Sequence, residues 1–405
     1  MRFFPPPPSL YVSICSISYL LVFIHRMGAA VLSAEIQTDL EATPLSVGLL
    51  CSVFFYTYAV MQIPAGILTD RFGPRRVMMT ALCLGAFGSA LFAAAPNVSW
   101  AFAGRFFIGM GMACVLVPSY RLLAEWFSPQ EFVGKASVVV SVAGCGGLLA
   151  GAPLAMGNAA FGWRVCQSVL SIVALLLAVL MWCHVRDRPH EKKSSGDFFS
   201  FSGTMRTLCR VCQNRRIQIL SFWFFVNGGI CFSFSGLWAG TYFVEVCGWT
   251  QKASSFLVSL FGVGIVIGPL LITFVSRIMK GSRILEVSML LLAVLLGILL
   301  LYGDHMAYIV ACLWSVSFTA VIAAPFGVVF DIVRDAFDSS AGSLASGLVY
   351  TFCMLGAACM QGGIGFQLQK MSEDSLLEQG DFVPVFMGYL VLALIAAVAA
   401  RFIRR

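Results

Sequence analysis

The sequence alternates between long apolar runs and short polar turns along its whole length. Twelve of these runs are long enough to cross the hydrocarbon core of a bilayer, which takes roughly 20 residues of α-helix. The pattern therefore predicts twelve membrane-crossing helices, at about 10–31, 46–68, 77–95, 100–124, 136–157, 165–183, 217–244, 253–275, 285–302, 307–330, 341–367 and 383–401.

A polar and mostly basic segment, 184–216, separates the first six runs from the last six. We expect residues 1–183 and 217–405 to form one bundle each, with a cytoplasmic linker between them that carries an amphipathic turn near 205–212. The halves also look like repeats, because the basic turn at 66–76 has a basic counterpart at 276–283. The prediction is an all-α integral membrane protein with two pseudo-symmetric six-helix bundles.

The amino-acid composition supports an integral membrane protein and argues against a soluble, disulfide-rich or metal-binding protein. Hydrophobic residues make up 59% of the 405 residues and charged residues 11%, with a mean hydropathy of +0.90, whereas about a quarter of the residues of soluble domains are charged. The 14 cysteines lie mostly inside apolar runs, and the 4 histidines show no metal-ligand spacing. We expect no disulfide framework, no metal, no cofactor and no enzymatic activity.

The net charge of +7 is distributed asymmetrically. If the N-terminus is cytoplasmic, most of the 26 Lys and Arg lie on the cytoplasmic side, and only Arg164, Lys252 and Lys370 lie on the other. Since cytoplasmic loops are enriched in Lys and Arg, both termini are expected to be cytoplasmic. The basic balance therefore indicates topology in a lipid bilayer and not a nucleic-acid partner. The first run is too long for the core of a signal peptide and is expected to be retained.

The turn between the second and third runs is the most distinctive motif. Its defining residues are one acid, three arginines and two glycines, Gly66, Asp70, Arg71, Gly73, Arg75 and Arg76. They resemble the signature of the major facilitator superfamily, G-x-x-x-D-R-x-G-R-R, with Pro74 as the one oddity. Arg105-x-x-x-Gly109-x-Gly111-x-Ala113 is similar to a second motif of that superfamily, in its fourth helix.

This resemblance covers the whole chain and implies a secondary transporter that works by alternating access. His25-Arg26 in the first run and Tyr56-x-Tyr58-x-x-x-Gln62 in the second are similar to bacterial carriers near the organic-anion and nitrate-type uptake branches. A multi-pass monomer in the bacterial inner membrane is implied. The cargo implied is a small organic anion, with a proton as the coupling ion.

Arg26 is the principal candidate for binding the anion. A guanidinium at bilayer depth costs at least about 2.5 to 3.5 kcal/mol, and Arg26 has no acid three or four residues away. Its planar fork suits a carboxylate or a sulfonate. The resemblance points to the same residue, and the absence of an arginine deep in the seventh helix disfavours a phosphate ester. The alternative is a structural Arg26 that binds backbone carbonyls or a distant glutamate.

Further polar residues are expected to line a cavity between the halves. Superfamily members use the arginine at this place in the fourth helix in different ways. By resemblance, Arg105 is expected either to contact the substrate or to act in conformational coupling and proton movement. For proton coupling the candidates are His25 and Glu35, although an interhelical hydrogen bond is an alternative for His25. The remaining substrate-binding candidates are Tyr19, Tyr58, Gln62, Asn227, Trp238 and Gln361.

The basic turn is expected to act as a cytoplasmic latch between the halves that favours the outward-open state. By resemblance, Asp70 would lie against the start of the eleventh helix, near 339–342, where a carboxylate meets the positive end of a helix dipole. Gly66 is expected to permit close helix approach. Arg71, Gly73, Arg75 and Arg76 complete the gating set.

Two other functions remain open. A drug or metabolite antiporter that exports its cargo shares the basic turn, but such proteins commonly carry G-P-x-x-G-G in the fifth helix. This chain reads Gly144-Cys145-Gly146-Gly147 there, which favours uptake. A transporter-like solute sensor, with the basic linker as a docking segment, is the second alternative.

Overall fold

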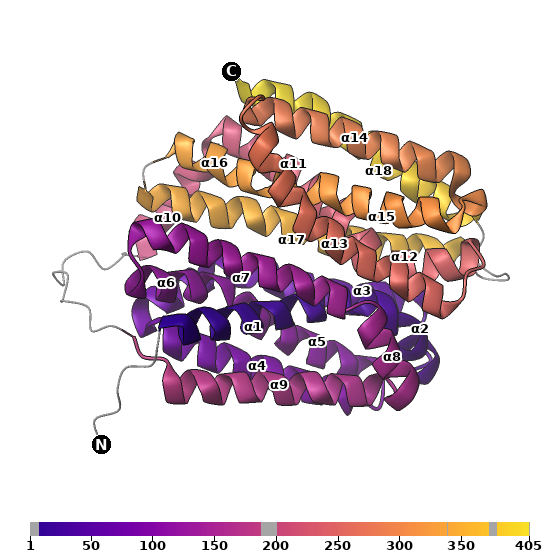
Figure 1. Ribbon diagram of the computed structural model, residues 1–405, viewed down its shortest axis with the longest axis horizontal. Coiled ribbons are helices and arrows are strands. Elements are labelled where there is room, and N and C mark those ends of the chain that lie inside the picture. Colours follow the sequence, from indigo (N-terminus) through magenta and orange to yellow (C-terminus); the bar gives the residue numbers. More distant parts are fainter. Residues whose placement is uncertain (1–7, 188–200, 338, 372–378, 405) are drawn as a thin grey trace.

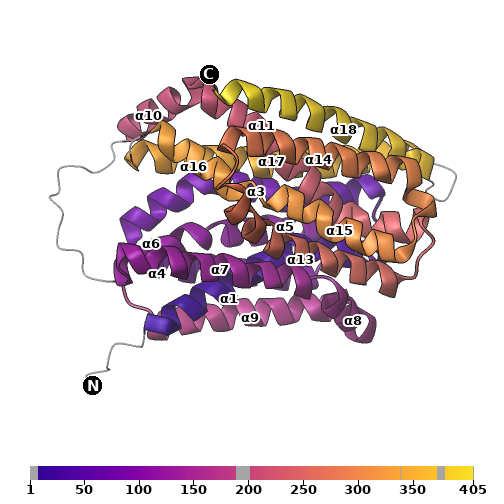
Figure 2. The same cartoon turned by 45° about the horizontal axis from the view of Figure 1, so that its top comes forward.

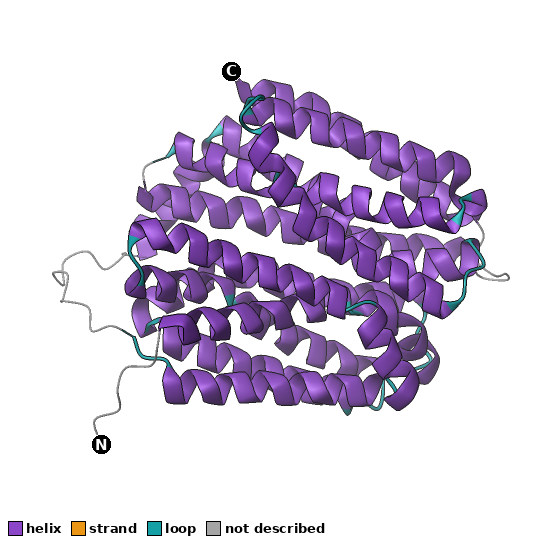
Figure 3. Cartoon of the chain, viewed as in Figure 1, coloured by secondary structure: helices purple, strands orange, loops and turns teal. Residues whose placement is uncertain are grey.

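The computed structural model describes residues 8–187, 201–337, 339–371 and 379–404, and every regular element in these ranges is a helix (Figure 3). Eleven helical segments are long and apolar enough to cross a membrane, and a bent pair makes a twelfth span if it is counted as one. The predicted fold class, an all-α membrane protein of two six-helix bundles, is confirmed. The boundaries at 183/184 and 216/217 stay a prediction.

The six spans of the N-terminal half include three that are interrupted. The first span is broken near Gly28, the fourth at 114–115 and the fifth at 150–151, where its two parts are bent by 45°. The elements in chain order are α1 (Pro8–Met27), α2 (Ala29–Asp39), α3 (Pro44–Phe72), α4 (Pro74–Ala93), α5 (Val98–Ala113), α6 (Leu116–Trp126), α7 (Pro129–Leu149), α8 (Ala152–Phe161) and α9 (Trp163–His184).

The C-terminal half begins after a separate linker helix, which confirms the amphipathic segment expected near 205–212. The C-terminal part of its first span contains two π-helical stretches, η1 and η2. The elements are α10 (Phe201–Gln213), α11 (Arg215–Ser233), η1 (Phe234–Trp238), α12 (Ala239–Thr241), η2 (Tyr242–Val246), α13 (Gln251–Val275), α14 (Gly281–Tyr302), η3 (Gly303–His305), α15 (Tyr308–Ala323), α16 (Phe326–Ala336), α17 (Ser339–Met371), α18 (Gln379–Arg401) and η4 (Phe402–Arg404).

Three of the predicted spans differ from the structure because of proline. The runs at 100–124, 136–157 and 307–330 were expected as single helices, but each is divided close to Pro118, Pro153 or Pro325. Proline lacks the N–H that would bond to the carbonyl four residues earlier, and its ring clashes with that carbonyl. The first helix, expected to end at Val31, resumes after Gly28 and continues to Asp39.

Several helices start at polar side chains that accept backbone N–H groups. Thr43 accepts from the N–H of Ser46 at the start of α3, and Asn97 accepts from Trp100 at the start of α5. Ser128 and Glu131 form a reciprocal capping box at the start of α7. Such caps satisfy N–H groups that have no partner within the helix, so these residues fix where the spans begin.

The two halves lie side by side with their helices roughly parallel, and both termini lie at the same end (Figure 1). We call the end that carries the termini, α6, α10 and α16 the linker end, and the end with α2, α8 and α12 the far end. Between the halves, α3 packs against α17 and α7 packs against α13. These two helix pairs therefore form the seam of the molecule.

Both helix pairs cross at glycines, the α3–α17 pair near the far end and the α7–α13 pair close to the middle of α13. A Cβ atom at Gly365 of α17 would lie 2.8 Å from the carbonyl oxygen of Pro44 and 3.3 Å from the Cα atom of Gly48, both in α3. A Cβ atom at Gly262 of α13 would lie 2.6 Å from the backbone nitrogen of Leu148 in α7. Small residues allow helices to approach closely in lipid. The halves are thus in backbone contact at both crossings.

Candidate functional site

Arg26 lies close to the end of α1 and is almost fully enclosed, with 1% of its surface exposed. Its Cζ atom is 5.0 Å from the ring centre of Phe23, 4.9 Å from that of Tyr58 and 5.1 Å from that of Phe232. Aromatic faces within about 6 Å attract a cation. Since the rings come from α1, α3 and α11, both halves of the protein surround this one guanidinium.

Only some of the hydrogen-bond donors of the guanidinium have an acceptor. Nη1 of Arg26 donates to the hydroxyl of Tyr350 at 3.4 Å, which is longer than an ordinary N–H···O bond. Nε and Nη2 have no hydrogen-bond partner. These two nitrogens form one edge of the guanidinium plane, and a carboxylate can bind such an edge through two parallel hydrogen bonds.

The charge of Arg26 is also uncompensated. No acidic side chain in the described ranges forms an ion pair with it. The alternative in which Arg26 serves structure by binding backbone carbonyls or a glutamate therefore finds no support among the described contacts. Arg26 is thus a buried guanidinium with an unoccupied hydrogen-bonding edge and, among the described residues, no ion-pair partner.

Two other predicted residues adjoin Arg26. Tyr19 is buried, packs edge-on against Phe23 with ring centres 5.4 Å apart, and lies beside Tyr350. Tyr58 presents its ring face to Arg26, while its hydroxyl has no hydrogen-bond partner. Both residues bring a hydroxyl group close to the cation. The structure thus brings together Arg26, Tyr19, Tyr58 and Tyr350.

The predicted residue Gln62 lies one turn further along α3. Its side-chain nitrogen donates to the carbonyl oxygen of Tyr58 at 3.4 Å, and the residue is 8% exposed. Its amide is thereby turned toward the helix backbone. Gln62 therefore borders the cluster around Arg26 without contacting the guanidinium in this conformation.

Trp238 and Gln361 join α17 to the π-helical part of the seventh span. The indole N–H of Trp238 donates to the carbonyl of Gln361 at 3.2 Å, and the side chain of Gln361 donates to the carbonyl of Phe232 at 2.8 Å. Phe232 in turn covers Arg26. These two residues connect the cation to the far-end seam. Asn227 lies apart, donating to the carbonyl of Ile322 in α15 at 3.3 Å.

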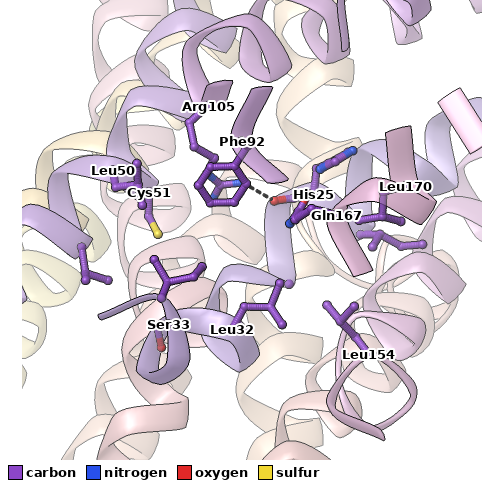
Figure 4. A pocket seen from close by; sticks show the side chains of 14 residues that line it. His25, Leu32, Ser33, Leu50, Cys51, Phe92, Arg105, Leu154, Gln167 and Leu170 are labelled. Atoms are coloured by element: carbon purple, nitrogen blue, oxygen red, sulfur yellow. Dashed lines mark hydrogen bonds between the residues drawn. The ribbon is translucent and has the colours of Figure 1, made fainter. Parts of the chain in front are cut away.

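Arg105 belongs to a different environment, inside the N-terminal bundle. Its Nη1 donates to the backbone carbonyl of His25 at 3.1 Å, and its Cζ lies 5.5 Å and 5.7 Å from the ring centres of Phe54 and Phe92. Figure 4 shows Arg105 and His25 beside a small cavity of about 10 Å³. Such a space holds about one water molecule, so it is too small for an organic anion.

The two proton-coupling candidates each carry a buried atom without a partner. His25 shares a hydrogen bond of 3.3 Å between its Nε2 and the hydroxyl of Ser89, which realises the interhelical bond considered above. Its Nδ1 has no partner, and neither has Oε2 of Glu35 in α2. The structure therefore places His25 within the N-terminal bundle and Glu35 at the far end of the first span.

The basic turn is held to the end of the first half. Gly73 has a φ of 83°, which glycine adopts without strain, and it separates α3 from α4. The carboxylate of Asp187 accepts the N–H of Arg75 at 2.9 Å, at the positive end of the α4 dipole. The guanidinium of Arg75 lies 4.6 Å from the ring centre of Trp182 and donates to its carbonyl.

The other residues of the turn are less constrained. Asp70, Arg71 and Arg76 are exposed. Asp70 is expected to lie near 339–342, and the side chains at 339–341 lie outside the described residues. A Cβ atom at Gly66 would meet nothing within 4 Å. The expectation that Gly66 permits close helix approach is therefore wrong for this conformation, since there is open space beside it.

Two important residues were not identified from the sequence. Phe232 completes the ring enclosure of Arg26, but one phenylalanine among 35 carries no distinguishing signal. Asp187 caps α4 from more than a hundred residues away, and its sequence position indicates only an acid in the linker. Both depend on contacts between distant segments, which a single sequence does not specify.

Known proteins share both the sequence pattern and the fold. A hexuronate transporter of Bacillus subtilis is 24% identical over 398 residues, covering 94% of this chain and 92% of that protein. A probable sulfoacetate transporter of Cupriavidus necator is 24% identical over 271 residues, covering 65% and 63%. A bacterial homologue of the human lysosomal transporter Spinster, solved in an inward-facing and unoccupied conformation, matches at a TM-score of 0.74 with 15% identity, covering 99% of this chain and 98% of the other.

The family model described as Major Facilitator Superfamily matches residues 15–360. This range includes the basic turn, the motif around Arg105 and most of both bundles. Together with the helical architecture, the match confirms the resemblance noted from the sequence. The chain belongs to the major facilitator superfamily of multi-pass membrane transporters.

Proposed function

We propose that this protein is a secondary transporter that moves a small organic anion, a carboxylate or a sulfonate, by alternating access. The observation that supports this most directly is the free edge of Arg26, formed by Nε and Nη2 in a ring-lined site between the halves. An anion bound there makes two charge-assisted hydrogen bonds and neutralises a charge that is otherwise costly at this depth.

The proposed substrate class follows from the number of basic side chains that can bind its acid group. The seventh span, from Arg215 to Val246, has basic residues only at its linker end, so α11 offers no second cation beside Arg26. One guanidinium suits a monovalent acid group better than a phosphate ester. Two relatives are named for the transport of hexuronate and sulfoacetate. Hexuronate has a carboxylate, and sulfoacetate has a carboxylate and a sulfonate, which are the acid groups proposed here.

The direction of transport and the topology are part of the same proposal. If both termini are cytoplasmic, as the charge distribution favours, the far end faces outward in the bacterial inner membrane. The crossing of α3 and α17 at Gly365 then holds these two helices together on the outer side. Proton-coupled uptake by a monomer is proposed, with His25 and Glu35 as the groups that exchange the proton.

Anion binding should stabilise the purified protein. A ligand at 100 times its Kd adds about 2.7 kcal/mol to the free energy of unfolding, so a thermal-shift assay with a hexuronate and with sulfoacetate should reveal the cargo class. The matched neutral hexose lacks the acid group and should produce no shift. An equal shift with the neutral sugar would contradict recognition through Arg26.

Asp70 is proposed to act in gating and Asp187 in holding the turn. Asp70→Asn should lower the uptake rate in proteoliposomes several-fold without changing which anion is preferred, because Asp70 lies outside the site and is exposed in this conformation. The matched variant Asp187→Asn weakens the cap of α4 and should instead lower the melting temperature, since a lost cap costs about 1 kcal/mol. A changed anion preference in Asp70→Asn would rule out a purely conformational role.

A further inference from the structure

An open cavity lies at the linker end of the C-terminal half, far from Arg26. Its volume is about 520 Å³, and its lining comes from the start of α11, the end of α16 and the end of the chain. Figure 2 shows α10, α16 and the C-terminus near one another at this end. The lining residues are Asn214, Arg215, Arg216, Asp335, Ala336 and Phe402.

The cavity is positively charged. Arg215 and Arg216 are both exposed, and Asp335 is the one acid of the lining. The neighbouring helix α10 adds Arg206 and Arg210, which are exposed and four residues apart, hence on one face of that helix. The local charge therefore favours an anionic ligand.

A helix cap positions the backbone of Arg215 and Arg216 beside the cavity. The side-chain oxygen of Asn214 accepts the N–H of Arg216 at 2.9 Å and that of Ile217 at 3.3 Å, so α11 starts at a defined residue. Val211 of α10 is fully buried, and α10 packs against α11 and α17. The linker helix thus lies on the bundle by its apolar side, with its basic side outward.

The cavity also adjoins a surface that faces lipid. An apolar stripe runs along α18 at intervals of three and four residues and ends at the cavity. Its members are exposed although they are large and apolar, as expected for a face covered by acyl chains. They are Val391, Leu394, Ile395, Val398 and Phe402.

We propose that this cavity binds the headgroup phosphate of an anionic phospholipid. The guanidinium groups of Arg215 and Arg216 hold the phosphate, Phe402 lies at the mouth, and an acyl chain follows the stripe of α18. Arg206 and Arg210 extend the same attraction to neighbouring headgroups. A bound lipid would then fix the junction of α10 and α11 at the membrane surface, which assigns the basic linker a role as a lipid anchor.

The test is lipid retention by the full-length protein, measured by native mass spectrometry after purification with phosphatidylglycerol or with phosphatidylcholine. The parent chain should retain phosphatidylglycerol roughly thirtyfold better, because two arginines near an anionic surface contribute that factor together. The double variant Arg215→Gln/Arg216→Gln should lose most of this preference. A melting curve in phosphatidylcholine confirms that the variant is folded.

The control removes the same charge from the same end of the molecule. Arg277→Gln/Lys280→Gln changes two exposed residues of the turn between α13 and α14, outside the cavity, and should keep the preference. Equal losses in both double variants would mean general surface attraction and overturn the proposal. Displacement of phosphatidylglycerol by millimolar inorganic phosphate would assign the cavity to free phosphate and overturn it as well.

Discussion

Replacing Arg26 by methionine should abolish anion binding while leaving the empty protein at least as thermally stable as the parent chain. The anion loses two charge-assisted hydrogen bonds, each contributing about 1.5 to 3 kcal/mol, so binding should weaken by at least about a hundredfold. The empty protein loses a buried charge that has no ion-pair partner in the described part of the chain. Such a charge costs at least about 2.5 to 3.5 kcal/mol in the membrane. Melting curves with and without the anion measure both effects.

Two further variants separate this role from a structural one. Arg26→Lys keeps the charge but lacks the planar fork, so it should bind the anion far more weakly than the parent chain. Arg105→Met removes an equally buried arginine that donates to the carbonyl of His25, outside the cluster around Arg26, and it should preserve the affinity for the anion. If Arg26→Met still shifts its melting temperature on adding the anion, the site lies elsewhere.

A leucine at Gly365 should reduce transport by tenfold or more. A Cβ atom there would lie 2.8 Å from the carbonyl oxygen of Pro44, and this oxygen cannot move without shifting α3. Overpacking costs typically about 1 to 3 kcal/mol, which corresponds to roughly 5- to 150-fold in the balance between conformations. The conformation closed at the far end should be depopulated, as distances between spin labels at the far ends of α3 and α17 would report.

Gly363 provides a matched control in the same helix. A Cβ atom at this position would meet nothing within 4 Å, and the residue is exposed. Gly363→Leu changes helix propensity as much as Gly365→Leu does, so it should transport at close to the parent rate. Wild-type transport by Gly365→Leu, with unchanged label distances, would show that closure at this crossing is not required.

Much of the fold was predictable because it depends on local composition. Spans of about 20 apolar residues, polar caps such as Thr43 and Ser128, and a basic linker are properties of neighbouring residues. The interruptions at Pro118, Pro153 and Pro325 were also visible in principle, because proline removes a specific backbone hydrogen bond. They were missed because membrane helices often tolerate proline when neighbouring groups satisfy the freed carbonyl.

Part of the candidate site could be predicted from the sequence, namely the residue whose charge is unusual inside a membrane. Arg26 stands out because charge at bilayer depth is costly, and Tyr19 follows from helical spacing, seven residues earlier. The enclosure by Phe232 and the hydrogen bond to Tyr350 come from the other half of the chain. Helical periodicity carries no information on such contacts, since they depend on how two separately folded bundles meet.

The glycine crossings have a consequence for how this chain can evolve. At Gly48, Gly262 and Gly365 the halves meet through backbone atoms, whereas the proposed anion site consists of the side chains of Arg26 and its tyrosine neighbours. Mutations that exchange those tyrosines can alter the preferred cargo without disturbing the surfaces on which the halves close. If the proposed site binds the cargo, cargo choice and conformational cycling are separable traits, and a lineage can diversify the first while it keeps the second.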